Sequence, residues 1–134
     1  IDPLIGQKHR EHHKDPESVE KVFIPTHIYP LVLPLFLIWP LILPIPLALT
    51  LIIFDLFMSL QYEWTHYFVH TKYQPKTKYW QRLKANHRLH LYKNENYWYG
   101  VSMLFGDKIF NTAPPHTAVP FSETARDLEK GFYK

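Results

Sequence analysis

The sequence predicts an all-α protein built on a membrane-embedded helical hairpin, with histidine-bearing helices at the membrane interface. First, residues 28–60 carry a single charged side chain, Asp55, in an otherwise uncharged and mostly apolar run. Second, Pro40, Pro44 and Pro46 interrupt that run near its middle. Third, seven of the 9 histidines lie outside it in three clusters, each spaced as on one face of a helix. An apolar run of this length is typical of a membrane protein.

The composition narrows the class of protein. The chain has 134 residues, a net charge of +3 and no cysteine. This charge is too small to predict nucleic-acid binding, and a basic flank on an anionic membrane surface is the better interpretation. Without cysteine, disulfides and thiolate ligands are excluded, so histidine is the remaining strong metal ligand. Because there is no initiating Met and no leader pattern before the histidines, we expect a segment of a longer protein.

The first element is a short helix over the first histidines. In "HREHH", His9, His12 and His13 stand at positions i, i+3 and i+4. Residues at these spacings share a helix face, so the three imidazoles can point the same way.

The apolar run that follows is too long for one crossing. At about 1.5 Å per residue, a helix over 28–60 would extend roughly 50 Å, against a hydrocarbon core of about 30 Å. Closely spaced prolines remove backbone donors, so we expect a hairpin bend at 40–46. The first limb, 28–39, is short and contains Pro30 and Pro34, which predicts a kinked or tilted helix. The second limb, 46–70, is long enough to cross and emerge.

A hairpin brings both polar ends to one side of the membrane. The positive-inside rule predicts the cytosolic side, because basic residues follow the second limb: Lys72, Lys76, Lys78, Arg82 and Lys84. The alternative is a buried hairpin inside a soluble helical bundle, which the scarcity of polar residues on either limb disfavours.

The second limb carries one polar stripe. At about 100° per residue, Asp55 and Glu63 both lie within roughly 60° of the direction of His66. Ionisable residues inside a span face protein rather than lipid. Both carboxylates are therefore candidates to hydrogen-bond the histidines and fix their orientation. The alternative is that they lie in the headgroup region or cap another segment.

Two more histidine pairs follow the hairpin. His66 and His70 are spaced i and i+4, and His87 and His90 are spaced i and i+3. The hairpin returns the first of these pairs to the initial cluster, and the second follows closely along the chain. Neutral imidazole binds iron, zinc and copper well, so a convergence of seven predicts a two-metal site.

The two remaining histidines are assigned differently. His27 and His116 have no partner at helical spacing, so we expect ordinary surface or hydrogen-bonded residues. A purification tag or a loose metal buffer is the alternative for a histidine-rich tract, but neither extends across a hairpin.

Several motifs follow one another in a specific order: "HREHHKDP", "VFIP", the apolar hairpin, "YEWTHYFVHT", "LKANHRLHLY" and "YGVSMLFGDKIFNT". Together, over roughly residues 8–112, they resemble the fatty acid hydroxylase family of the sterol desaturase superfamily, closest to its fatty acid 2-hydroxylase-like branch. The resemblance implies seven metal ligands: His9, His12, His13, His66, His70, His87 and His90. Tyr99 and Gly100 match the family's Tyr-Gly pair, and Asp107 with 110–112 matches its closing element.

The resemblance also implies a division of the chain. It makes residues 1–134 a single, N-terminally truncated domain. Within it we expect the membrane hairpin at 28–62, a histidine-bearing cytosolic-side part at 63–112 and a C-terminal tail at 113–134.

This sequence departs from the family pattern twice. The family's first histidine pair is absent, which fits a segment of a longer protein. In addition, Leu91 stands where the family has the second of two consecutive histidines. Leucine cannot ligate a metal, so the site has an open position, holds one metal weakly, or belongs to a member that has left catalysis.

For a typical member, the resemblance implies two irons that use O2 to hydroxylate a CH2 group of a membrane lipid or fatty acyl chain. Zinc is the alternative metal of the isolated protein. Electrons come from an external donor, commonly cytochrome b5 or a reductase. We expect an integral membrane protein of the endoplasmic reticulum in a eukaryote, or of the inner membrane in a bacterium, with the histidines on the cytosolic side.

The aromatic stretch 92–100 supplies candidates for a substrate entrance, namely Tyr92, Trp98 and Tyr99. The alternative is an interfacial aromatic belt. Two other functions stay open. A catalytically impaired member that binds lipid or a partner is supported by Leu91, and a sterol or carotenoid oxidase would share the site but not the substrate.

Overall fold

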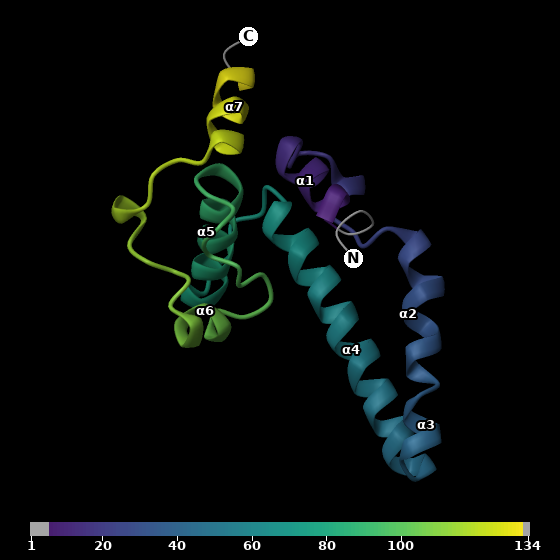
Figure 1. Cartoon of the computed structure of the whole chain (residues 1–134). Helices are drawn as coiled ribbons and strands as arrows, with labels where there is room; N and C mark the ends of the chain where they lie inside the picture. The colour runs from purple at the N-terminus through teal and green to yellow at the C-terminus, as the bar shows by residue number, and fades with distance from the viewer. Residues whose placement is uncertain (1–5, 133–134) are drawn as a thin grey trace.

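The computed structural model describes residues 6–132, which form helices and loops with no strand in that range (Figure 1). The α-helices are α1 (Gln7–Lys14), α2 (Tyr29–Phe36), α3 (Trp39–Ile42), α4 (Ile45–His70), α5 (Lys78–Tyr92), α6 (Phe105–Phe110) and α7 (Glu123–Phe132). Short 3-10 helices lie at Val19–Lys21, Thr26–Ile28 and His116–Ala118. The prediction of an all-α fold is confirmed.

The apolar run forms a hairpin. α2 and α3 make the first limb, and α4 is the second limb. α3 packs against α4 beside the bend, and the two limbs diverge from there toward α2 (Figure 1). Two segments are long and apolar enough to cross a membrane, Val19–Ile42 with 24 residues and Ile45–His70 with 26. Only 11% and 6% of their apolar windows are buried inside the protein, so their side chains point outward as on lipid-facing helices. The alternative of a buried hairpin in a soluble bundle is therefore not supported.

The bend is narrower than the predicted 40–46. It consists of Leu43, which is extended, and Pro44, with φ −54° and ψ 139°. Pro40 and Pro46 instead lie in the first turns of α3 and α4, where a missing N–H breaks no helical hydrogen bond. The first limb is interrupted after Phe36, because Pro40 lacks the N–H that would bond the carbonyl of that residue.

α4 is long and apolar enough to carry the chain across the apolar layer of a bilayer and out of it. Its 26 residues extend about 39 Å, which exceeds a hydrocarbon core of about 30 Å. Hydroxyls within the apolar part bond the helix itself: Thr50 donates to the Pro46 carbonyl and Ser59 to the Asp55 carbonyl, each at 2.8 Å. These bonds satisfy groups for which lipid offers no partner.

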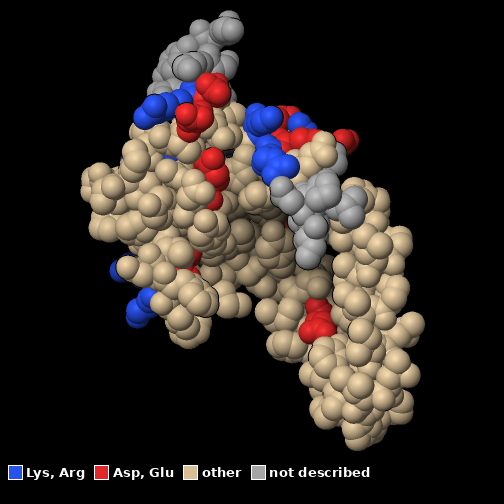
Figure 2. All heavy atoms as spheres, in the orientation of Figure 1, with Lys and Arg blue, Asp and Glu red and all other residues tan. Residues whose placement is uncertain are grey.

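The helices beyond the polar end of α4 form what we call the head, comprising α1, α5, α6 and α7 (Figure 1). α5 is fastened to α4 by Lys84, whose ammonium donates to the carbonyls of Thr71 and Tyr73 just after α4 ends. α7 packs against α1 and α5. Charged side chains gather on the head, whereas the visible surface of the hairpin is nearly free of them (Figure 2).

A crossing hairpin predicts the accessibility of single cysteines introduced into this cysteine-free chain. Lys14→Cys and Lys78→Cys replace exposed side chains before and after the hairpin. Both should react with a membrane-impermeant maleimide from the same side of sealed vesicles. Ile42→Cys, next to the bend, should react from the opposite side. Labelling of positions 14 and 78 from opposite sides would exclude the hairpin topology.

Candidate metal centre

Seven histidines come together where α1, α4 and α5 meet, and they form two groups. The first group contains His12, His66, His70 and His87, and the second contains His9, His13 and His90. Within each group, one nitrogen from every imidazole lies within 4.8 Å of the others. That spread suits a shared ion, since metal–nitrogen bonds of about 2.1 Å place ligand atoms at most about 4.2 Å apart. Each group of imidazoles would therefore have to move only slightly closer together to bind one ion.

Helix geometry assigns the members of each group. On α1, His9 and His13 are one turn apart and enter the same group, while His12 turns toward α4. α4 contributes His66 and His70 from its last turns. α5 divides its pair between the two groups.

The two groups are neighbours. His12 lies with its ring centroid 4.7 Å from that of His70 and 5.2 Å from that of His66. In the second group, the centroids of His13 and His90 are 4.8 Å apart. The centroids of His12 and His13, which are adjacent in sequence but belong to different groups, are separated by 5.9 Å. Two ions would therefore be held side by side.

Several ring nitrogens in these groups are buried and have no hydrogen-bond partner among the described residues. They are both nitrogens of His12, both of His66, Nδ1 of His13 and Nδ1 of His87. Leaving a polar group buried and unsatisfied costs about 1–3 kcal/mol, so six such atoms in one place require an explanation. A bound cation would satisfy those that face each group, and a set made only of imidazoles suits iron, zinc or copper. The residues present thus fit a metal centre.

Backbone carbonyls orient two of the imidazoles. Nδ1 of His70 lies 3.0 Å from the Pro16 carbonyl oxygen, and Nδ1 of His90 lies 2.7 Å from that of Tyr97. A carbonyl oxygen only accepts, so Nδ1 carries the proton in both rings. The lone pair is then on Nε2, the nitrogen that can bind a metal. In His70 this nitrogen lies 3.0 Å from Nε2 of His87, and a shared ion would replace that contact.

The histidines outside the membrane span are held neutral. Burial, followed by repulsion from the neighbouring histidines, lowers the pKa of His12 to about 3 and that of His13 to about 4. The same two causes hold the pKa of His87 well below its ordinary value. Neutral imidazole is the form that ligates metals, so no proton has to be displaced from these rings near pH 7.

The chain matches a family of known proteins. The family model described as fatty acid hydroxylase matches residues 2–112, which include all seven histidines. The chain belongs to the fatty acid hydroxylase family. The family predicted from the motifs is thereby confirmed.

Curated relatives of this family member are fatty acyl hydroxylases. A dihydroceramide fatty acyl 2-hydroxylase of Arabidopsis thaliana is 33% identical over 79% of this chain and 45% of its own length. Fatty acid 2-hydroxylases of Rattus norvegicus and Mus musculus are 30% and 29% identical over 84% of this chain and 30% of their own length. The chain thus spans less than half of the curated relatives that it matches. No solved structure matches it significantly.

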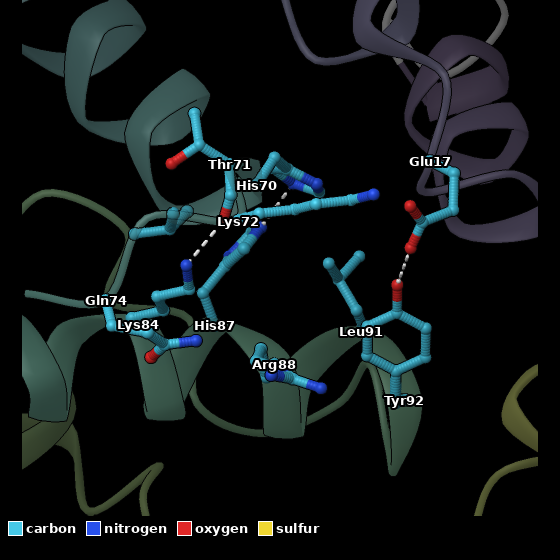
Figure 3. A pocket seen from close by; sticks show the side chains of 11 residues that line it. Glu17, His70, Thr71, Lys72, Gln74, Lys84, His87, Arg88, Leu91 and Tyr92 are labelled. Atoms are coloured by element: carbon cyan, nitrogen blue, oxygen red, sulfur yellow. Dashed lines mark hydrogen bonds between the residues drawn. The ribbon is translucent and has the colours of Figure 1, made fainter.

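In this hydroxylase-family chain, Leu91 is the residue that the motif comparison predicts to replace a family histidine. Its side chain is 2% exposed and lines a cavity of about 260 Å³ together with His70 and His87 (Figure 3). Leu91 is one turn beyond His87 on the same face of α5. An imidazole at this position would therefore stand beside the four-histidine group.

The two carboxylates expected to orient histidines have other surroundings. Glu63 accepts a hydrogen bond from the Ile24 backbone N–H at 3.0 Å and so ties the segment before α2 to α4. Asp55 is partly buried, two turns before Glu63 on α4 and further from the histidines. Neither carboxylate is hydrogen-bonded to a histidine within residues 6–132. This is a correction of the sequence prediction, and the carbonyls of Pro16 and Tyr97 take that role.

The three aromatic candidates for a substrate entrance differ in position. Tyr99 is 54% exposed, and its ring centroid lies 5.5 Å from that of His90, which suits an entrance. Tyr92 lines the same cavity as Leu91 and donates to the Glu17 carboxylate at 2.9 Å (Figure 3). Burial and this hydrogen bond raise the pKa of Tyr92 to about 12.

Trp98 does not fit the entrance and is a correction. It is 2% exposed, and its indole N–H donates to the Pro114 carbonyl. Its backbone N–H donates to the Thr112 carbonyl at 2.8 Å, so Trp98 holds the loop after α5 together. His27 and His116, which the sequence predicts to be ordinary surface or hydrogen-bonded residues, are exposed.

Asp107 organises the loop that carries Tyr99. It is buried, and its two oxygens accept four hydrogen bonds. The donors are the backbone N–H groups of Tyr99 and Gly100, the Asn86 side chain on α5 and the Thr112 hydroxyl, at 2.6–2.9 Å. The sequence marked Asp107 as part of a motif, but not as the residue that joins this loop to α5 beside His87.

Gly100 in this loop and Gly106 in the following helix make a matched pair of substitutions. A Cβ on Gly100 would lie 2.5 Å from the Met103 carbonyl oxygen and 2.7 Å from the Asp107 carboxylate, whereas a Cβ on Gly106 meets nothing within 4 Å. We expect Gly100→Ala to destabilise the protein by about 1–3 kcal/mol. Gly106→Ala, in helix α6, should be neutral or stabilising by up to about 1 kcal/mol. Thermal unfolding in detergent measures both, and equal midpoints would contradict this account of the loop.

Proposed function

We propose that the protein is a membrane-bound lipid hydroxylase that inserts one oxygen atom of O2 into a CH2 group of an acyl chain. The observation that carries this proposal is the pair of histidine groups, with buried partnerless nitrogens, at the polar end of an apolar hairpin. The relatives named as fatty acid and dihydroceramide fatty acyl 2-hydroxylases support a fatty acid or a sphingolipid acyl chain as substrate. They favour this substrate over a sterol or a carotenoid.

The proposed cofactor is a pair of iron ions, one in each histidine group, with zinc as the alternative metal of the isolated protein. His12, His66, His70 and His87 would hold one ion, and His9, His13 and His90 the other. Iron, when bound, supplies the activation of O2 that no side chain of this chain can provide. The protein's own contribution is to hold the imidazoles neutral, oriented and away from bulk water.

An apolar cavity beside the histidines is suited to the acyl chain. It has a volume of about 290 Å³, and His9, His12 and His66 form part of its wall. The rest of the wall comes mainly from the segment before α2 and from the hairpin, including Val22, Phe23, Ile24, Pro25, Ile28, Val32 and Tyr62. Such a wall excludes water and orients a methylene group next to the imidazoles.

The proposed reaction needs an external source of electrons. Converting R–H and O2 to R–OH and water consumes two electrons and two protons. We propose that an electron-donor protein, cytochrome b5 or a reductase, docks on the cytosolic side of an endoplasmic reticulum or bacterial inner membrane. The division into one domain over 1–134, with a hairpin at 28–62, a histidine-bearing part at 63–112 and a tail at 113–134, remains part of this proposal.

A second candidate is a catalytically impaired family member that binds lipid or a partner. Leu91 favours it, because a buried leucine beside His70 and His87 supplies no ligand. Metal content separates the two candidates. About two irons per full-length chain, with a hydroxylated acyl product, would support the hydroxylase, and the absence of both would leave the impaired member.

Removal of single histidines tests the ligand sets. His12→Ala and His70→Ala each delete a member of the four-histidine group, so we expect metal affinity to fall by at least about 10–100-fold. His116→Ala is the matched control, because His116 is exposed and belongs to neither group. Elemental analysis of purified full-length protein measures the bound metal. Equal retention in all three variants would rule out this assignment.

Restoring the family's histidine is the converse test. Leu91→His places an imidazole beside the four-histidine group, so we expect slower loss of metal to a chelator and no loss of fold. Leu91→Met, which is similar in volume to leucine and a poor ligand for iron, controls for the change in packing. Identical metal release from both variants and the natural chain would contradict a ligand position at residue 91.

A further inference from the structure

An apolar ridge on the head faces outward without a protein partner among the described residues. It consists of Met103, two residues before α6, and of Phe105, Ile109 and Phe110 within α6. The exposed fractions of these four side chains are 46%, 66%, 58% and 76%. Four large apolar side chains on so short a segment are unfavourable in water. Lys108, between them in sequence, is also exposed.

The ridge lies at the depth where α4 leaves the apolar layer. A cavity of about 460 Å³ separates α6 from α4, and its wall includes Phe110 on one side and Tyr62 on the other. Tyr62 stands two residues after Leu60, the end of the apolar run, and one turn before His66. In Figure 1, α6 lies at the end of the head toward which the hairpin extends. In a bilayer that covers the apolar part of the hairpin, this would place the ridge at the level of the membrane–water interface.

This cavity approaches both histidine groups. The ring of Tyr62 is centred 5.6 Å from that of His66, in the four-histidine group. The ring of Tyr99, also in the cavity wall, is centred 5.5 Å from that of His90, in the three-histidine group. Tyr62 additionally lines the 290 Å³ cavity into which the histidines project. The two cavities thus share one wall residue.

Two glycines keep the cavity open. Gly100 and Gly106 both line it. Gly106 borders empty space, since a Cβ there would have no neighbour within 4 Å. The loop cannot easily collapse into that space, because Asp107 holds it to α5 through four hydrogen bonds.

We propose that the cavity between α4 and α6 is the lateral entrance through which an acyl chain passes from the bilayer to the histidines, with the α6 ridge immersed in the lipid interface as its outer lip. The entrance rests on the proposed function. The chain enters beside Phe110, passes Tyr62 and ends in the cavity lined by His9, His12 and His66.

Lipid is the occupant that the surroundings favour. The ridge continues the apolar surface of the hairpin at the same depth, so the bilayer that covers one reaches the other. Lys108 suits this position, because its stem can lie along the apolar layer while its ammonium reaches lipid phosphates. Aromatic side chains such as Tyr99 and Phe105 also favour the interface.

Filling the cavity at Gly106 tests the entrance in the full-length, metal-loaded protein. Gly106→Leu places a side chain in the open space, and Gly106→Ala is the matched control that leaves most of it free. The probe is a fatty acid with a diazirine in its chain, presented in phosphatidylcholine vesicles. We expect it to label residues around Tyr62 and Met103 in the natural chain and in Gly106→Ala. In Gly106→Leu, the leucine side chain should displace about two methylene groups of the bound fatty acid from the cavity. The resulting loss of affinity should reduce this labelling about tenfold.

The outcomes separate the entrance from the proposed function. Labelling confined to the segment 22–32 and unchanged in Gly106→Leu would overturn the entrance and leave the hydroxylase intact. No labelling in any variant that retains metal would overturn the entrance and count against an acyl substrate as well.

A second measurement, which does not depend on filling the cavity, tests whether the ridge contacts lipid. Ile109→Cys carrying bimane should be quenched by brominated lipids in vesicles. Bimane at Thr117→Cys, an exposed position in the 3-10 helix His116–Ala118, which lies apart from α6 (Figure 1), should not. Absence of quenching at residue 109 would show that the ridge is covered by protein or water and would overturn the proposal.

Discussion

The burial of uncharged imidazoles is the constraint on which this structure depends. Each unsatisfied ring nitrogen opposes folding, and the unsatisfied nitrogens come from three helices that are far apart in the sequence. α1 precedes the hairpin, whereas α5 follows it. The hairpin therefore does more than anchor the chain, because it brings two distant polar segments to one place. A helix that crossed once would leave His12 and His66 on opposite sides of the membrane.

The surroundings of the histidines divide into two kinds of support. On one side, polar contacts fix ring orientation through the backbone, with the carbonyls of Pro16 and Tyr97 as acceptors. On the other, the segment before α2 supplies an apolar wall, and Glu63 fastens that segment to α4 by its bond to Ile24. The first support determines which nitrogen is free, and the second determines what can approach it.

Much of this arrangement could be predicted from the sequence. Helical spacing identifies the seven histidines that converge, since i, i+3 and i+4 relations are local, and hydropathy with the prolines identifies the hairpin. The division into groups of four and three could not be predicted, because it depends on how α1 is rotated relative to α4 and α5. The partners of His70 and His90 are main-chain carbonyls, which leave no signal in residue identity. Trp98 was misplaced for a related reason, as its burial depends on a loop held by Asp107.

The clamp at Lys84 has a mechanical consequence. Its ammonium bonds the main chain immediately after α4, so α5 and the last turn of α4 are joined as one stiff body. A helix longer than the local bilayer is thick responds by tilting. Any such tilt of α4 is transmitted to α5, and the imidazoles borne by the two helices rise or sink together relative to the lipid phosphates. Under the proposed function, membrane thickness would therefore affect which carbon of an acyl chain reaches the histidines.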